Sequence, residues 1–354
     1  MFTSIVIALA MRSAVDAVAS SAPPNSQPSS QKCTPLAPPS GKSGVGVSSS
    51  ASVRDEETKL MVLSSPKAGA TLAMRLMLAR LNLTAAAQRY PQYPLHYTHA
   101  EFNRMQGRTP PRRVEDLRPC SSGGGWLCIE IVRNPLDRAI SSYFMTLRTS
   151  IHLSFAELGD ACGPGVPAAA CKSNASFAEF ARALAARALT RTRSKADDHF
   201  MPQLPLTKHN RGGFPGVVRV PIEMMSEADG AECAPLAPLQ PWRLPEAEAR
   251  VFGERVSTGH HYVVKEKNTS GNSEHLPFAV LAAASAMPAY DSFWTNQTFC
   301  RKVVGCLYRA DVALYVGACT DAASPLRGCA AYERVCAREL ARLRGVCGLD
   351  LDEH

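Results

Sequence analysis

Two stretches of this chain share one pattern: a short apolar run, a tight turn, and then apolar residues at helical spacing. The first, residues 60–83, reads "LMVLSSPKAGATLAMRLMLARLNL", and the second, residues 126–148, reads "WLCIEIVRNPLDRAISSYFMTLR". Short apolar runs bounded by turn residues are typical of strands buried on both faces, which occur in parallel sheets covered by helices. The repeated pattern therefore predicts an α/β, P-loop-like three-layer fold with a central, mainly parallel sheet flanked by helices.

The two turns carry residue types that suit a bound anion. Lys67, Gly69 and Thr71 stand where the first strand passes into its helix, and Arg133 ends the second strand. Backbone N–H groups at a helix start lack intrahelical partners, and the helix dipole adds positive charge there. Ligands of open α/β sheets bind at this edge, beyond the carboxyl ends of the strands. We therefore expect both turns to bind phosphate groups.

Composition and motif order argue against several classes of function. The first turn lacks the Walker A order G-x-x-x-x-G-K-[ST], because its lysine precedes its glycine, so the triphosphate of ATP or GTP is not the expected ligand. The net charge of +8 favours anionic ligands, but the aromatic content is only 7% and no nucleic-acid-binding signature is present. We expect no nucleic-acid partner. No cysteine pair has the CxxC spacing of common zinc sites, and we expect no metal.

The cysteines and the glycosylation sequons indicate a secretory protein. The chain has 12 cysteines, half of which fall from Cys300 onward. A content this high favours disulfides formed in an oxidising compartment over free thiols. Sequons of the form N-x-S/T begin at Asn82, Asn174, Asn268 and Asn296. We therefore expect a disulfide-bonded glycoprotein of the secretory pathway.

The chain divides by composition into a leader, a stem, a folded region and a tail. Residues 1–19 contain "FTSIVIALAM", which is too short for a membrane-spanning helix and resembles the core of a signal peptide. A signal peptide, an N-terminal anchor that associates with a membrane, and a disordered start remain open there. Residues 20–58 are rich in Ser and Pro and predict a disordered stem. Residues 317–354 are cysteine-rich and predict a helical, disulfide-pinned cap.

The two turns resemble the carbohydrate sulfotransferases, Golgi-type enzymes that use 3′-phosphoadenosine-5′-phosphosulfate (PAPS) as sulfate donor. "PKAGAT" is similar to the family's P-K-x-G-x-[TS] loop, and "RNPLDRAISSY" is similar to its R-[DN]-P-x-x-R-x-x-S-x-[YW] segment, in the same order. The resemblance covers residues 59–316, which we predict to be the sulfotransferase domain. It implies transfer of a sulfuryl group from PAPS to a carbohydrate hydroxyl, with the two segments binding opposite ends of one donor molecule.

The resemblance also implies roles for individual residues. The first loop would hold the 5′-phosphosulfate through Lys67, Ala68, Gly69, Ala70 and Thr71. Ala70 departs from the Gly, Ser or Thr usual in the family but keeps its backbone N–H. Arg133 and Ser141 would hold the 3′-phosphate, whereas Arg138 is expected to be structural, paired with a carboxylate such as Asp137 or with a helix end.

Two histidines are candidates for the catalytic base. His99 lies in "PLHYTHAEFNRM", between the two phosphate segments, and its surroundings are similar to the H-A-[DE]-[WF] segment of heparan-type enzymes. His199 lies in "DDHFMPQL", which looks like the H-[WF]-x-P-Q segment of chondroitin- and HNK-1-type enzymes. Histidine can accept a proton near neutral pH, and Lys67 can stabilise the leaving phosphate. We predict His99 as the base, with His199 as the alternative.

Downstream, "GVVRVPIEMM" (216–225) predicts a further strand, with Glu223 at the family's acidic position, and residues 300–316 predict one amphipathic helix. Two other functions remain as alternatives. A P-loop nucleotide-dependent kinase would explain the first turn but should show a Walker A loop and an acidic Mg²⁺ ligand. A non-catalytic, secreted glycan-binding protein would explain the charge and the cysteines. The favoured acceptor is a polysaccharide or a glycoprotein glycan in the Golgi lumen.

Overall fold

The structure is a computed structural model of the 354-residue chain. It describes residues 35, 51–65, 68–69, 73, 76–78, 80–83, 120, 125–149, 173–190, 203, 217–227, 233, 235–236 and 289–352. All of these belong to the unit that begins at Thr34. The predicted leader at residues 1–19 lies outside the described residues, as do residues 20–34 and 36–50 of the predicted stem.

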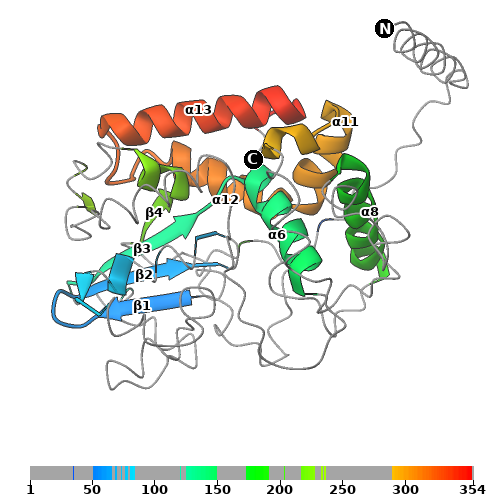
Figure 1. The fold of residues 1–354 in the computed structure, drawn as a ribbon. Coiled ribbons are helices and arrows are strands. Elements are labelled where there is room, and N and C mark those ends of the chain that lie inside the picture. The colour runs from blue at the N-terminus through cyan, green and yellow to red at the C-terminus, as the bar shows by residue number, and fades with distance from the viewer. Residues whose placement is uncertain are drawn as a thin grey trace, which may run out of the picture. The chain divides into compact units, whose positions relative to one another are not determined.

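The described strands form one mixed sheet (Figure 1). Its order is β1 (Ala51–Asp55), β2 (Leu60–Ser64), β3 (Leu127–Val132) and β4 (Val217–Pro221). Strand β1 pairs with β2 in antiparallel orientation, whereas β2, β3 and β4 are parallel to one another. The prediction of an α/β fold with a mainly parallel sheet is therefore confirmed.

Alternation along β2 and β3 gives the sheet two buried faces. Leu60 and Val62 join the large core cluster, together with Ile129 and Ile131 of β3. Met61 and Leu63, which point to the opposite face, form a second cluster with the disulfide-bonded Cys120 and Cys128. Side chains of a strand point alternately to the two faces, so a continuous apolar run signals burial on both. This is why both strands are recognisable from the sequence.

The prediction of a disordered stem as far as residue 58 is wrong at its end, because residues 51–58 belong to the fold. Strand β1 pairs with β2 from Ala51↔Ser64 to Asp55↔Leu60. The buried Asp55 then accepts hydrogen bonds from the Glu57 N–H, the Thr58 hydroxyl and Arg80 Nε. An edge strand needs only one partner and few apolar residues, so this Ser-containing stretch shows no clear strand pattern.

Helices pack on the face of the sheet that carries the large cluster. They are α6 (Pro135–Thr149), α8 (Asn174–Thr190), α11 (Gln297–Cys300), α12 (Arg309–Thr320) and α13 (Ala330–Cys347), with the 3₁₀ helices η6 (Ile222–Ser226) and η9 (Tyr290–Phe293) and the π-helix η10 (Arg301–Leu307). Tyr143 of α6 joins α8 through ring contacts with Phe177 and Phe180. Helix α12 contacts both the sheet and α13 (Figure 1).

The single helix predicted over residues 300–316 is wrong, because the chain bends at Tyr308. The segments Gln297–Leu307 and Arg309–Thr320 meet at 86°. Tyr308 is fully buried, and its ring lies 5.7 Å from the Arg138 guanidinium carbon. The apolar spacing continues across the break, so the pattern alone could not reveal it.

Among the described residues no single helix is long and apolar enough to cross a membrane. The bent pair Gln297–Leu307 and Arg309–Thr320 meets that test by length and composition.

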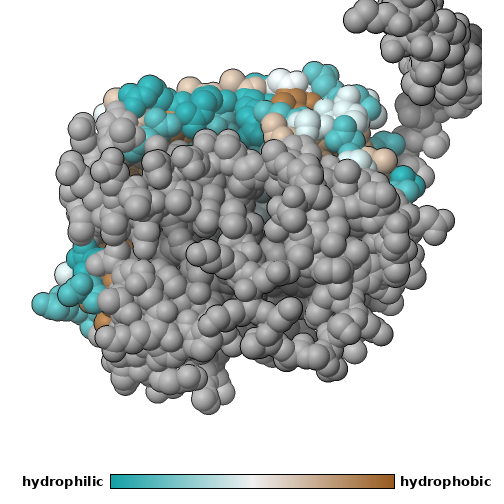
Figure 2. Space-filling model, in the orientation of Figure 1, coloured by the Kyte–Doolittle hydropathy of each residue, from teal (hydrophilic) through white to brown (hydrophobic). Residues whose placement is uncertain are grey.

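The C-terminal segment is a disulfide-linked helix that is part of the main core. Disulfides join Cys233 to Cys329, Cys300 to Cys347, and Cys319 to Cys336. Buried residues of α13 such as Val335 and Leu343 belong to the same core cluster as the sheet residues. Helix α12 also runs to Thr320, across the predicted boundary at residue 317. The cap is therefore continuous with the domain, and its outer face is mostly hydrophilic (Figure 2).

Candidate functional site

The first turn has the strand–turn–helix form that the sequence predicts. Beyond β2, the Ala68 N–H donates to the Ser65 carbonyl at 3.0 Å and closes a tight turn. The Gly69 carbonyl accepts from the Ala73 N–H at 2.9 Å, so helical hydrogen bonding begins at Gly69. The start of this helix therefore lies beyond the carboxyl end of β2.

Gly69 is required by both backbone conformation and space. Its φ is +106°, which other residues rarely adopt. A Cβ atom at this position would lie 2.5 Å from Ile222 Cδ1 and 3.3 Å from Ile131 Cγ2. Since Ile131 is in β3 and Ile222 follows β4, the turn packs closely against residues at the carboxyl ends of β3 and β4.

Gly69→Ala should therefore lower the free energy of unfolding by about 2 kcal/mol, from backbone strain and overpacking together. Gly317→Ala is the matched control, because Gly317 lies inside α12 and a Cβ atom added there would meet nothing within 4 Å. It should raise stability by about 0.5–1 kcal/mol through helix propensity. Urea unfolding of both variants measures this difference, and equal effects would show that the turn at Gly69 is not tightly constrained.

The second turn places Arg133 and the N-cap of α6 as predicted. The Leu136 N–H donates to Asn134 Oδ1 at 3.0 Å, and α6 begins at Pro135. Arg133 itself is 5% exposed. Its backbone is held by Gln203, which accepts from the Arg133 N–H and donates to the Arg133 carbonyl, both at 2.9 Å. The amide of Gln203 thus fixes the carboxyl end of β3.

The side chains of Arg133 and Ser141 both act on one hydroxyl group. This is the hydroxyl of Tyr290 in η9, whose pKa both side chains lower against the effect of burial, and the Arg133 guanidinium carbon lies 5.9 Å from the centre of the Tyr290 ring. Burial raises the pKa of Tyr290 to about 12, so the hydroxyl keeps its proton at neutral pH. A guanidinium and two hydroxyl groups are therefore gathered at one point, which is a donor set that suits a phosphate.

Arg138 is structural, as predicted. Its partner is not Asp137, the example of a carboxylate partner that the sequence offered. The Arg138 guanidinium donates to Asp311 Oδ2 at 2.8 Å, and both side chains are fully buried. Asp137, the predicted example, instead pairs with Arg342. Asp311 also accepts a hydrogen bond from the Gln203 N–H. The ion pair therefore connects α6 and α12 to the residue that fixes Arg133.

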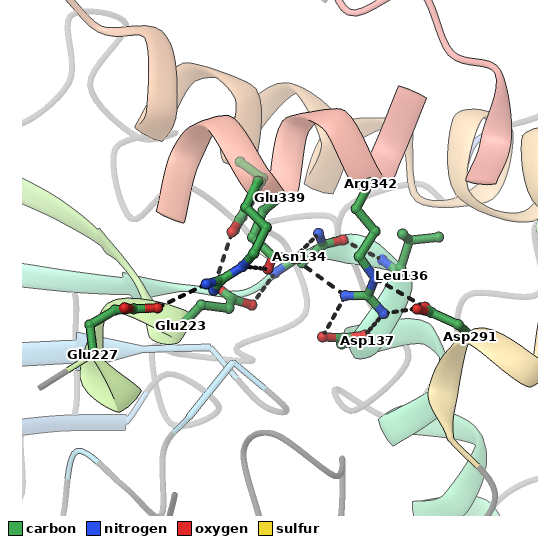
Figure 3. A network of polar contacts seen from close by, with 10 residues as sticks. Asn134, Leu136, Asp137, Glu223, Glu227, Asp291, Glu339 and Arg342 are labelled. Carbon is green, nitrogen blue, oxygen red and sulfur yellow. Dashed lines mark hydrogen bonds and ion pairs between the residues drawn. The ribbon is translucent and has the colours of Figure 1, made fainter. Parts of the chain in front are cut away.

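Acidic groups surround the turn between β3 and α6 (Figure 3). Glu223 accepts from the Asn134 N–H at 3.3 Å and from the Tyr315 hydroxyl at 2.9 Å. Burial, with the nearby charges of Glu339 and Asp137, raises the pKa of Glu223 from 4.5 to about 7. Glu339 accepts from Asn134 Nδ2 at 3.0 Å. The predicted acidic position thus lies at the sheet edge, where it holds the backbone beside Arg133.

Some predicted site residues lie outside the described residues, namely Lys67, Ala70, Thr71, His99 and His199. Sequence reasoning missed Tyr290 and the side-chain role of Gln203. Gln203 stands in the quoted "DDHFMPQL" segment, but Tyr290 belongs to no motif and comes to Arg133 only through the fold. Within the described ranges, no group of three or more His, Cys, Asp or Glu side chains could hold a metal ion.

Comparison with protein families decides the class of this chain. The model of the sulfotransferase family matches residues 50–262. The chain belongs to the sulfotransferase family. The match contains both turns and begins at the position of β1. A search of curated proteins found no match, and neither did a search of solved structures.

Membership assigns sulfuryl transfer as the general reaction of this sulfotransferase, and members of the family generally use PAPS as donor. The matched range ends before Tyr290 and before the whole of α13. The contacts that these elements make with the second turn are therefore features of this chain beyond the matched part.

Proposed function

We propose that this sulfotransferase transfers the sulfuryl group of PAPS to a hydroxyl group of a carbohydrate. The observation that carries the proposal is the position of the two turns. One follows β2 and the other follows β3, and these strands are parallel neighbours. Their carboxyl ends therefore lie about 5 Å apart at one sheet edge. A nucleotide with phosphate groups on its 5′ and 3′ oxygens presents two anionic ends at a spacing that such a pair of turns can bind.

Each turn receives one end of the donor in this proposal. Lys67, Ala68, Gly69, Ala70 and Thr71 hold the 5′-phosphosulfate at the helix start. Arg133 and Ser141 hold the 3′-phosphate. Lys67 stabilises the negative charge on the phosphate that leaves, and His99 accepts the proton of the acceptor hydroxyl, with His199 as the alternative base. The reaction needs no metal, because lysine and backbone dipoles supply the positive charge.

We place the enzyme in the secretory pathway, in the Golgi lumen, with a polysaccharide or a glycoprotein glycan as acceptor. Four disulfides among the described cysteines support an oxidising compartment. The sequon residues Asn82 and Asn296 are exposed, which suits glycosylation. Residues 1–19 would direct the chain into this pathway as a signal peptide or hold it at the membrane as an anchor.

Incubation of the purified protein with sulfate-labelled PAPS and a panel of glycans tests the proposal. We expect labelled glycan, with inhibition by 3′,5′-adenosine bisphosphate but not by ATP. His99→Ala and His199→Ala, assayed in parallel, identify the base as the residue whose loss stops transfer while nucleotide binding persists. Phosphate transfer from ATP would instead support a kinase, and glycan binding without any transfer would support a non-catalytic lectin-like protein.

A further inference from the structure

We propose that Arg342 of α13 is a positioning residue for the donor's 3′-phosphate, acting on Arg133 and Ser141 from outside the part of the chain that matches the family. This inference rests on the proposed function, because it concerns the same donor site. It adds a residue that no sequence motif identifies, and it gives the C-terminal helix a role in donor recognition.

Arg342 connects two segments that carry the phosphate-binding groups (Figure 3). Its guanidinium donates to both oxygens of Asp137, in the first turn of α6, at 2.7 and 3.1 Å. It also donates to Asp291 Oδ1 at 2.5 and 3.0 Å. Asp137 shares α6 with Ser141, and Asp291 directly follows Tyr290. The Arg342 side chain therefore fixes α6, which carries Ser141, against η9, which carries Tyr290.

A second contact from α13 reaches the residue next to Arg133. Glu339, one helical turn before Arg342, accepts from Asn134 Nδ2 at 3.0 Å and pairs with Arg342 at 3.3 Å. Asn134 is also held through its backbone by Glu223. Two contacts therefore hold the turn between β3 and α6. Gln203 binds the backbone of Arg133, and Glu339 of α13 binds the side chain of Asn134.

Removing the guanidinium would leave several carboxylates close together. Asp137 is mostly buried and Asp291 is exposed, with side-chain exposures of 16% and 60%. Without Arg342 the like charges repel, and the exposed Asp291 can move away from α6, which shifts the adjoining Tyr290. Tyr290 would then no longer align the Arg133 and Ser141 side chains. Misplacement of binding groups by about 1 Å can cost a large factor in donor recognition.

Three variants separate positioning from simple charge attraction. Arg342→Met removes the links to Asp137, Asp291 and Glu339 together with one positive charge. Asp291→Asn cuts one link but removes a negative charge, so attraction alone predicts tighter anion binding whereas positioning predicts weaker binding. Arg344→Met is the matched control, because Arg344 lies on the same helix and pairs only weakly, at 3.7 Å, with the exposed Asp352.

The measurements are calorimetric affinity for 3′,5′-adenosine bisphosphate and the KM and kcat for PAPS. We expect about tenfold weaker binding in Arg342→Met and about threefold weaker binding in Asp291→Asn, with kcat at saturating PAPS within about twofold of wild type and Arg344→Met unchanged. If wild type does not bind the nucleotide, the proposed function fails. If wild type binds it and both variants bind equally well, or Asp291→Asn binds more tightly, the positioning role is contradicted while the function stands.

Discussion

Asp311→Ala should lower the free energy of unfolding by about 3–5 kcal/mol, because it removes the buried carboxylate that pairs with the Arg138 guanidinium in the core. Both side chains of this pair are fully buried, and the N···O distance is 2.8 Å. The same change removes the acceptor of the Gln203 N–H. Urea unfolding of the oxidised protein, followed by circular dichroism, measures the loss.

Glu333→Ala provides the control for this prediction. Glu333 pairs with Arg327 at a similar N···O distance of 3.0 Å, but both side chains are far more exposed to solvent, at 44% and 35%. Exposed ion pairs contribute about 0–1 kcal/mol, so this variant should unfold almost like wild type. Equal losses in the two variants would show that the Arg138–Asp311 pair is not a buried support of the site.

The parts of the fold with local signals could be predicted from the sequence. The apolar runs of β2 and β3, the turn containing Gly69 and the N-cap at Asn134 each depend on residues within a few positions of one another. Apolar runs, positive φ and capping are short-range effects, so the chain displays them directly. The structural role of Arg138 could be predicted from its local motif. The identity of its partner could not, because Asp311 lies 173 residues away in the sequence.

The parts that depend on tertiary contacts could not be predicted. Tyr290 reaches Arg133 across more than 150 residues of sequence, and Arg342 reaches Asp137 across 205. Such pairs leave no periodic pattern in the chain. The bend at Tyr308 was hidden because apolar residues continue on both sides of it, and β1 was hidden because an edge strand needs little apolar surface.

The central claim is that Arg133 and Ser141 bind the 3′-phosphate of the nucleotide whose 5′ end lies at the first turn. Calorimetry with 3′,5′-adenosine bisphosphate and with 5′-AMP isolates the 3′-phosphate, since the two ligands differ only by that group. Arg133→Met removes the charge that should bind it. Arg182→Met, on the exposed face of α8, is the control for loss of one positive charge.

In wild type and in Arg182→Met, we expect the 3′-phosphate to tighten binding about 100-fold, as charge-assisted hydrogen bonds to a guanidinium and a hydroxyl would provide. In Arg133→Met the same comparison should give less than about threefold, because the main partner of the phosphate is absent. If instead the ratio of the two affinities is the same in Arg133→Met as in wild type, Arg133 does not bind the 3′-phosphate and the central claim is contradicted.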